Sequence, residues 1–340
     1  MNLEILFGIG IIAIGAFASG SFSIPFEKTK VWNWENNWLI YCLFAYVLVP
    51  TVACAIFCPN FIDILYNFPS DRLLLIFSLG VVYGICNLTF GLSLRYLGIS
   101  LGFMISLGLM MILGTIIPPS VDGRLNILLQ QAGGTTLIIG LLVASMGIVV
   151  SAYAGYRKDK SATVRSSELN FGKGIAMALF VGISGSSQAL GIEQGNDISH
   201  AFSSAGTNPL FHTLPVFLIM FLGSFSITLI WCLIMAYQNR TIHLFVQTPN
   251  TPVGRNYLFC GLAGFLWFIN LIFFGMGKNY MGEFSFTAFG ILMSLTIVAA
   301  TLWGLYRGEW RSTNTQTKLS MYIGLLLLVT ASFIIGISGQ

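Results

Sequence analysis

Ten long apolar stretches, separated by short polar or charged segments, dominate the pattern of the chain. Each has about the 20 residues that an α-helix needs to cross the hydrocarbon core of a bilayer. Their apolar residues run on without the strict alternation of a membrane β-strand, so the pattern predicts helices and not a barrel. The predicted spans cover residues 5–25, 38–58, 73–94, 99–118, 135–154, 173–193, 210–237, 256–276, 285–306 and 319–338.

The composition agrees with a chain that lives in lipid. Of the 340 residues, 56% are hydrophobic and only 8% are charged, against about 25% charged in an ordinary globular domain. So apolar a chain would expose far more apolar surface than water tolerates, which excludes a soluble enzyme, a nucleic-acid binder and a disordered module. We therefore predict an all-α integral membrane protein with ten transmembrane helices and no nucleic-acid partner.

The basic residues are distributed unevenly between alternate loops. Thirteen of the 16 Lys and Arg residues fall in odd-numbered loops, and only Arg72, Arg124 and Lys278 fall in even ones. Because basic loops stay cytoplasmic, the odd loops are expected on the cytoplasmic side and both termini on the opposite, periplasmic side. We predict a multi-pass protein of the bacterial inner membrane whose basic loops contact anionic lipid headgroups.

The longest basic loop, residues 156–172, divides the chain into a first repeat, 1–155, and a second, 173–340, of five spans each. Spans three and eight share a pattern of matching residues: Asn87, Leu88, Phe90, Gly91, Tyr96 and Gly98 correspond to Asn270, Leu271, Phe274, Gly275, Tyr280 and Gly282. Halves with an odd number of spans run in opposite directions, and such inverted repeats are typical of alternating-access carriers. The pattern therefore favours a transporter.

Short motifs spread over most of the chain, densely up to Gly174 and more loosely after it, carry a family resemblance. They are Pro25–Glu35, Asn87 with Gly91–Gly102, Gly114–Pro118, Thr136–Ala144, Glu168–Gly174 and Asn208–Leu210. Together they resemble the L-rhamnose–proton symporters of the drug/metabolite transporter superfamily. The resemblance implies ten helices in two inverted groups of five. It also implies a secondary active transporter that imports a monosaccharide, L-rhamnose, by proton symport with alternating access.

The sequence departs from the family pattern where protons are expected to act. Glu27–Lys28 stands in place of two lysines, Ser285 in place of an aspartate, and Ser199–His200 in place of a His-Glu pair. The resemblance therefore bears more on fold and substrate class than on the proton site.

Two other functions stay open at this point. One is a metabolite or drug exporter of the same fold, because a fold does not fix the direction of transport. The other is an intramembrane serine protease, since Gly182–Gly185 matches a Gly-x-Ser-Gly motif and His212 is available as a base for Ser184. A channel fits poorly, because no span has a repeated polar face.

A monosaccharide needs side chains that donate and accept hydrogen bonds, together with an aromatic surface for its C–H face. The candidate substrate-binding residues within the spans are Tyr83, Asn87, Gln188, Trp267 and Asn270. The alternative role for the two asparagines is hydrogen bonding between helices. Trp32, Trp34 and Trp38 lie at the predicted cytoplasmic boundary, and we interpret them as interfacial anchors.

Proton import requires an acid that loads outside and unloads inside. The sequence offers Glu193, which directly continues the sixth span, and Glu283, which opens the ninth; Asp197 is a weaker candidate. Arg95 ends the third span, where it either anchors the following loop or binds a carboxylate in a cytoplasmic gate. The six cysteines lie in apolar runs without metal-site spacing, so no metal and no cofactor is expected. We expect the transporter to function as a monomer.

Overall fold

Helices form all the regular secondary structure in residues 3–121, 123, 125–130, 133–161, 170–246, 251–280 and 288–337, which the computed structural model describes. The α-helices are α1 Leu3–Ser21, α2 Trp34–Cys42, α3 Val49–Phe57, α4 Phe61–Tyr66, α5 Ser70–Leu97, α6 Ile99–Val121, α7 Leu125–Gln130, α8 Gly134–Ser161, α9 Phe171–Gln194, α10 Asn196–Ser204, α11 Leu214–Gln238, α12 Val253–Tyr280, α13 Ala288–Tyr306 and α14 Thr315–Ile337. Two 3₁₀ turns, η1 Ile24–Lys28 and η3 Ile242–Phe245, and one π turn, η2 Leu43–Leu48, complete them.

Nine helical segments of the described residues are long and apolar enough to cross a membrane, so the chain is a multi-pass membrane protein. They are Leu6–Lys28, Trp34–Phe57, Ser70–Leu97, Ile99–Val121, Gly134–Lys158, Phe171–Ser204, Leu214–Gln238, Val253–Tyr280 and Thr315–Ile335. The remaining predicted span, 285–306, coincides with α13, whose apolar segment Ile291–Tyr306 is shorter. Residues 281–287 lie outside the described residues.

The chain forms two compact units, each assembled from separated segments. Unit 1 comprises Met1–Gly20, Leu88–Ser186 and Met276–Gln340, and unit 2 comprises Ser21–Asn87 and Ser187–Gly275. The division falls within α1, α5, α9 and α12, so each of these helices contributes residues to both units.

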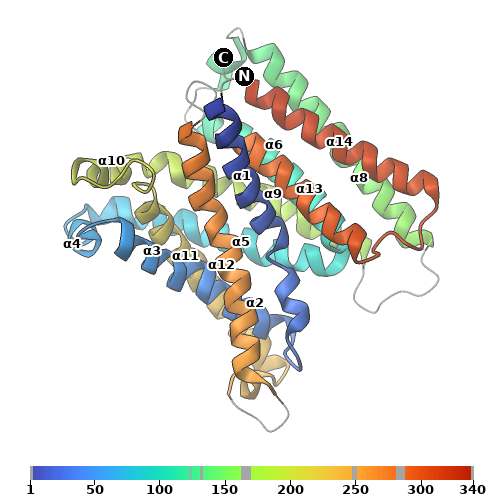
Figure 1. The fold of residues 1–340 in the computed structure, drawn as a ribbon, viewed down its shortest axis with the longest axis horizontal. Helices are drawn as coiled ribbons and strands as arrows, with labels where there is room; N and C mark the ends of the chain where they lie inside the picture. Colours follow the sequence, from blue (N-terminus) through green and yellow to red (C-terminus); the bar gives the residue numbers. More distant parts are fainter. Residues whose placement is uncertain are drawn as a thin grey trace. The chain divides into compact units, whose positions relative to one another are not determined.

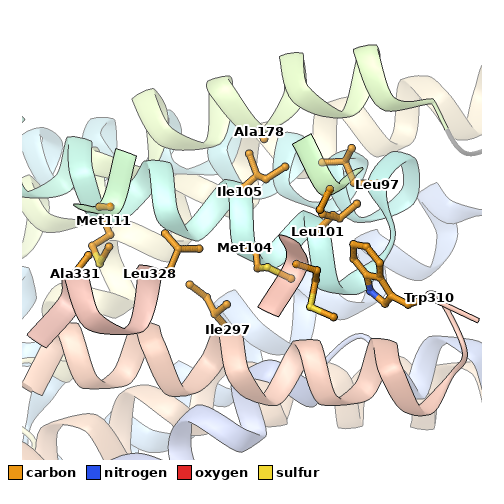
Figure 2. Close-up of a cluster of buried hydrophobic side chains, with 13 residues drawn as sticks. Leu97, Leu101, Met104, Ile105, Met111, Ala178, Ile297, Trp310, Leu328 and Ala331 are labelled. Carbon is orange, nitrogen blue, oxygen red and sulfur yellow. The ribbon is translucent and has the colours of Figure 1, made fainter. Parts of the chain in front are cut away.

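The core of unit 1 is a layer of aliphatic and Met side chains between helices. Leu101, Met104 and Ile105 follow helical spacing along α6 and bury one stripe of apolar surface, which Leu97 at the end of α5 extends. Figure 2 shows this stripe against Ile297 of α13 and side chains of α14. In Figure 1, α8 and α14 lie side by side, and small residues at their interface bring the two backbones together.

Unit 2 depends on two close helix crossings. A Cβ on Gly80 would lie 1.9 Å from the Met220 carbonyl oxygen, and one on Gly223 would lie 2.1 Å from that of Phe77. Only glycine permits this approach of α5 and α11, and Ser224 Oγ donates to the Gly80 carbonyl oxygen at 2.7 Å across the crossing. In the second crossing, a Cβ on Gly264 of α12 would lie 2.8 Å from the Tyr41 carbonyl oxygen of α2.

The second span is one continuous helix, α2–η2–α3, interrupted by the π turn at Leu43–Leu48. Pro50 follows directly and has no N–H to donate to the carbonyl one α-turn back, so the α-helical ladder is locally broken. The Val49 N–H instead reaches back five residues to the Phe44 carbonyl oxygen. Such π turns often occur where a helix carries functional side chains.

Contacts within each unit join odd loops to odd loops. In unit 2, the Lys30 N–H donates to Asn256 Oδ1 at 3.0 Å, and Asn256 Nδ2 donates to the Lys30 carbonyl oxygen at 2.8 Å. These bonds connect the first loop to the end of the seventh. In unit 1, Lys158 Nζ of the fifth loop lies 3.9 Å from Glu309 Oε2 of the ninth. This is the pairing expected if odd loops share one side.

Candidate functional site

All five residues predicted to bind substrate lie in unit 2 and are buried there, with 5–9% of each residue exposed. Tyr83 and Asn87 are on α5, Gln188 is on α9, and Trp267 and Asn270 are on α12. Polar groups buried in an apolar interior are costly unless they are paired, so five of them in one unit require an explanation.

Two of these residues, Tyr83 and Trp267, meet the same pair of aromatic rings. The Tyr46 ring centroid lies 6.4 Å from that of Tyr83 and 5.1 Å from that of Trp267. The Phe221 centroid lies 6.1 Å and 5.3 Å from the same two rings. Tyr46 and Phe221 themselves are stacked at 5.0 Å. The four rings form an aromatic cluster from α5, η2, α11 and α12.

Among the described residues, the two predicted asparagines make only weak or local hydrogen bonds. Asn87 Nδ2 donates to Cys42 Sγ at 3.1 Å, and Asn270 Nδ2 donates to the Trp267 carbonyl oxygen within its own helix. Sulfur is a weak acceptor, and each amide has two N–H groups and a carbonyl oxygen. These bonds therefore use a small part of what the two amides offer. Cys42 links Asn87 to α2 but does not bring it to Asn270.

Sequence reasoning missed the aromatic face of α2 and η2. Tyr41 and Tyr46 are fully buried, and the anchor role assigned to Trp38 is wrong because only 2% of this residue is exposed. The Tyr41 and Tyr46 hydroxyls and the Trp38 indole N–H make no hydrogen bond within the described residues. An unpaired buried donor costs about 1–3 kcal/mol. Aromatic residues at i, i+3 and i+8 of a span were the available signal.

Trp32 is also buried, and its indole N–H donates to the Leu244 carbonyl oxygen at 2.8 Å. It packs with Ile40 and Cys260 in a second apolar cluster of unit 2. Trp32 therefore joins loop segments of the protein, and the interpretation of this residue as an interfacial anchor is wrong.

Glu35 is the one buried charged residue among the side chains that the structure describes. Its Oε1 accepts hydrogen bonds from Asn239 Nδ2 and Thr241 Oγ1, both at 2.9 Å, and from Asn33 Nδ2 at 3.5 Å. Asn36 adds a bond from its Nδ2 to the Thr241 carbonyl oxygen at 3.2 Å. The Asn239 and Thr241 partners are 204 and 206 residues away along the chain, so no local sequence pattern points to them.

The predicted proton-coupling residues differ in what the structure describes. Glu193 is half-buried near the end of α9, five residues after Gln188, whereas Glu283 lies outside the described residues. The weaker candidate, Asp197, is held in an ion pair: Arg72 Nε lies 2.6 Å from its Oδ2.

Arg95, the candidate gate residue, lies in the last turn of α5 in unit 1 and is half-buried. The carboxylate that binds the loop after this helix is Glu309. Its Oε1 accepts the Ile99 N–H at 2.8 Å, and its Oε2 accepts the Ser100 N–H at 3.2 Å. Glu309 therefore caps the first turn of α6, where a negative charge is favoured.

The serine of the protease alternative and the six cysteines are all buried. Ser184 Oγ donates to the Phe180 carbonyl oxygen of its own helix, one turn earlier. All six cysteines are buried free thiols. Within the described residues, no group of three His, Cys, Asp or Glu side chains is placed to hold a metal ion.

The apolar helices and the buried polar and aromatic residues of unit 2 define a helical, multi-pass membrane protein with hydrogen-bonding groups in its interior. Comparison with known families identifies it further. The family described as L-rhamnose-proton symport protein matches residues 1–339, and the chain belongs to this family. The family description names a transporter and not an enzyme.

Individual relatives match over nearly their whole length. The L-rhamnose-proton symporter of Yersinia pestis (strain Pestoides F) is 29% identical over 340 residues, which cover 99% of each chain. The L-rhamnose-proton symporter of Yersinia pseudotuberculosis serotype O:3 (strain YPIII) gives the same values. That of Yersinia pestis bv. Antiqua (strain Antiqua) is 28% identical over 339 residues, again 99% of each chain.

Proposed function

We propose that this protein imports L-rhamnose together with protons by alternating access. The observation that carries the proposal is the family match over residues 1–339, because this range includes the helices of both units. Relatives named as L-rhamnose-proton symporters that match over 99% of both chains support it. The interior of unit 2 supplies the residue types that recognition of a neutral sugar requires.

In this proposal the substrate binds to Tyr83, Asn87, Gln188, Trp267 and Asn270. The Tyr83 and Trp267 rings offer flat apolar surfaces for the C–H face and the methyl group of a 6-deoxy sugar. The Asn87, Gln188 and Asn270 amides both donate and accept, as sugar hydroxyls do. Their burial supports this role, since a buried amide with weak or local bonds gains most from a polar ligand.

Proton coupling is assigned to Glu193 and Glu283, and Arg95 is assigned to a cytoplasmic gate. Glu193 is half-buried near the end of α9, five residues after Gln188, and its place on the helix that carries a substrate residue supports coupling between proton and sugar. A carboxylate in a membrane span is costly when charged, and this favours a group that binds and releases a proton during the cycle.

The proposed topology has ten spans in two inverted repeats, 1–155 and 173–340, in the bacterial inner membrane with both termini periplasmic. Odd loops contact each other through Lys158 and Glu309, and through Lys30 and Asn256. These contacts support a topology in which successive loops alternate between the two sides of the membrane. Reporter fusions are expected to report residues 156–172 as cytoplasmic; a cytoplasmic signal from a fusion at Gln340 contradicts the topology. The protein is proposed to act as a monomer surrounded by lipid.

Uptake of radiolabelled L-rhamnose into proteoliposomes tests the function. An inwardly directed proton gradient is expected to drive accumulation, and a protonophore is expected to abolish accumulation while leaving exchange of internal and external sugar intact. Unlabelled L-rhamnose should compete, and a hexose of different stereochemistry should compete less. Accumulation driven only when the gradient is reversed supports the exporter alternative, and no movement of L-rhamnose in either direction refutes the proposal.

A further inference from the structure

The first two turns of α2 hold two hydrogen-bond donors that have no partner in the part of the chain that the structure describes. Trp38 is 2% exposed and Tyr41 is fully buried. The Trp38 Nε1 and Tyr41 Oη atoms are themselves buried and make no hydrogen bond within the described residues. A cluster that served only to fill space would be more stable with Phe at position 41, because the hydroxyl adds an unsatisfied donor and no contact that needs it.

Aromatic rings pack against the Trp38 and Tyr41 side chains. The Phe22 ring is stacked on that of Tyr41 with centroids 5.2 Å apart, and the Phe26 ring meets it edge-on at 5.6 Å. The Trp38 and Tyr41 centroids are 5.0 Å apart. Flat apolar walls with a few directed donors match a monosaccharide, whose C–H groups pack on rings while its hydroxyl oxygens accept hydrogen bonds.

This aromatic pair is continuous with the site of the proposed function. Gly264 of α12 meets the Tyr41 backbone, and Trp267 lies one turn further along α12, against the Tyr46 ring. Cys42, the residue after Tyr41, accepts the hydrogen bond from Asn87. Trp38, Tyr41 and Tyr46 follow one another along α2 and η2. They therefore join Trp38 and Tyr41 to the predicted substrate residues within unit 2.

We propose that Trp38 and Tyr41 form a second part of the sugar site, an aromatic subsite that donates hydrogen bonds to the hydroxyl oxygens of a monosaccharide. The proposal rests on the proposed function and specifies which residues select among sugars. The described structure has the two donors buried and unsatisfied, and an entering sugar supplies the acceptors. A ligand that lacks those hydroxyls leaves both donors unsatisfied, and this difference discriminates against it.

The Tyr41→Phe variant tests the subsite because it removes one oxygen atom and keeps the ring. We expect its affinity for L-rhamnose in calorimetric titration to fall about tenfold, which corresponds to about 1.4 kcal/mol. Its melting temperature without sugar should be unchanged or higher, because a buried donor without a partner has been removed. Tyr66→Phe is the matched control, since Tyr66 is 88% exposed on α4; both its affinity and its melting temperature should equal those of the wild type.

A series of monodeoxy rhamnoses identifies the hydroxyl concerned. One of these sugars should bind wild type and Tyr41→Phe with equal affinity, because it already lacks the group that Tyr41 contacts. A different deoxy sugar should bind wild type and Trp38→Phe with equal affinity, because it lacks the hydroxyl that Trp38 contacts. For each protein we compare its affinity for L-rhamnose with its affinity for the deoxy sugar, and this ratio also gives an answer if a variant is somewhat less stable.

The outcomes separate the subsite from the proposed function. Unchanged rhamnose affinity in both Tyr41→Phe and Trp38→Phe, with a wild type that binds L-rhamnose, overturns the subsite and leaves the function. A lower melting temperature of Tyr41→Phe without sugar, at unchanged affinity, also overturns it by showing a structural role for the hydroxyl. If wild type binds another monosaccharide instead, and Tyr41→Phe weakens that binding, the subsite stands and the assignment of L-rhamnose fails.

Discussion

Removal of the Glu309 carboxylate is expected to destabilise unit 1 without touching the residues of unit 2. Glu309 caps the first turn of α6 through the Ile99 and Ser100 N–H groups, at 2.8 and 3.2 Å. Its side chain is 16% exposed and lies 3.9 Å from Lys158 Nζ. The Glu309→Ala variant leaves both N–H groups of the helix terminus without their acceptor.

The magnitude follows from the two bonds. A hydrogen bond to a charged group contributes about 1.5–3 kcal/mol, and the partial exposure of Glu309 favours the low end because water replaces part of what is lost. Two such bonds give a loss of about 3 kcal/mol in the free energy of unfolding. The Lys158 contact adds little, since an ion pair at this distance and exposure contributes about 1 kcal/mol or less. At about 2 °C for each kcal/mol, the melting temperature should fall by roughly 6 °C.

Thermal unfolding of the purified protein in detergent measures this loss. Glu309→Gln keeps one oxygen acceptor and should lose about half as much as Glu309→Ala. Asp63→Asn serves as the control, because Asp63 is an exposed carboxylate on α4 of unit 2 and should leave the melting temperature unchanged. A melting temperature of Glu309→Ala within about 1 °C of wild type would show that the cap does not stabilise α6 and would refute the reasoning.

Three further predictions concern substrate binding, proton coupling and helix packing. Asn87→Ala and Asn270→Ala should each weaken L-rhamnose binding about tenfold or more in calorimetric titration while leaving the melting temperature nearly unchanged; normal binding by both variants would make them helix contacts only. Glu193→Gln should abolish gradient-driven accumulation but not sugar exchange in proteoliposomes, and full accumulation in this variant combined with Glu283→Gln removes both acids from the mechanism. Gly223→Ala should destabilise the protein by about 3 kcal/mol, seen as a lower melting temperature, because its Cβ would lie 2.1 Å from a carbonyl oxygen of α5; a melting temperature equal to wild type would contradict the close crossing.

Hydropathy alone predicted the helical class and most helix positions, because a long apolar run has one stable form in lipid. It also predicted that the polar residues inside spans are internal: Asn87 and Asn270 are both 5% exposed. What it did not provide is the partner of each residue. The Asn87–Cys42 bond spans 45 residues, and the Glu35–Thr241 bond spans 206. Such pairs depend on helix packing, which a pattern along the chain does not encode.

The missed aromatic residues have a different cause. Hydropathy counts Tyr41 and Tyr46 as ordinary members of an apolar run, so their hydroxyls drew no attention. Trp38 lay at a predicted boundary, where exposed tryptophan is usual, and its burial depends on Phe22 and Phe26 from the preceding segment. Proline at position 50 was a usable signal for a break in the helix, because the missing N–H removes one bond of the ladder.

The geometry of the π turn determines which side chains of the second span face inward. A turn closed over five residues contains one residue more than an α-turn. If Leu43–Leu48 adopted α-helical geometry without losing a residue, everything before the turn would rotate by about 100° relative to everything after it. Tyr41 and Tyr46 would then point in different directions, although neither had been replaced. The conformation of this one turn, as much as the identity of the residues beside it, therefore sets which aromatic side chains share a face of the span.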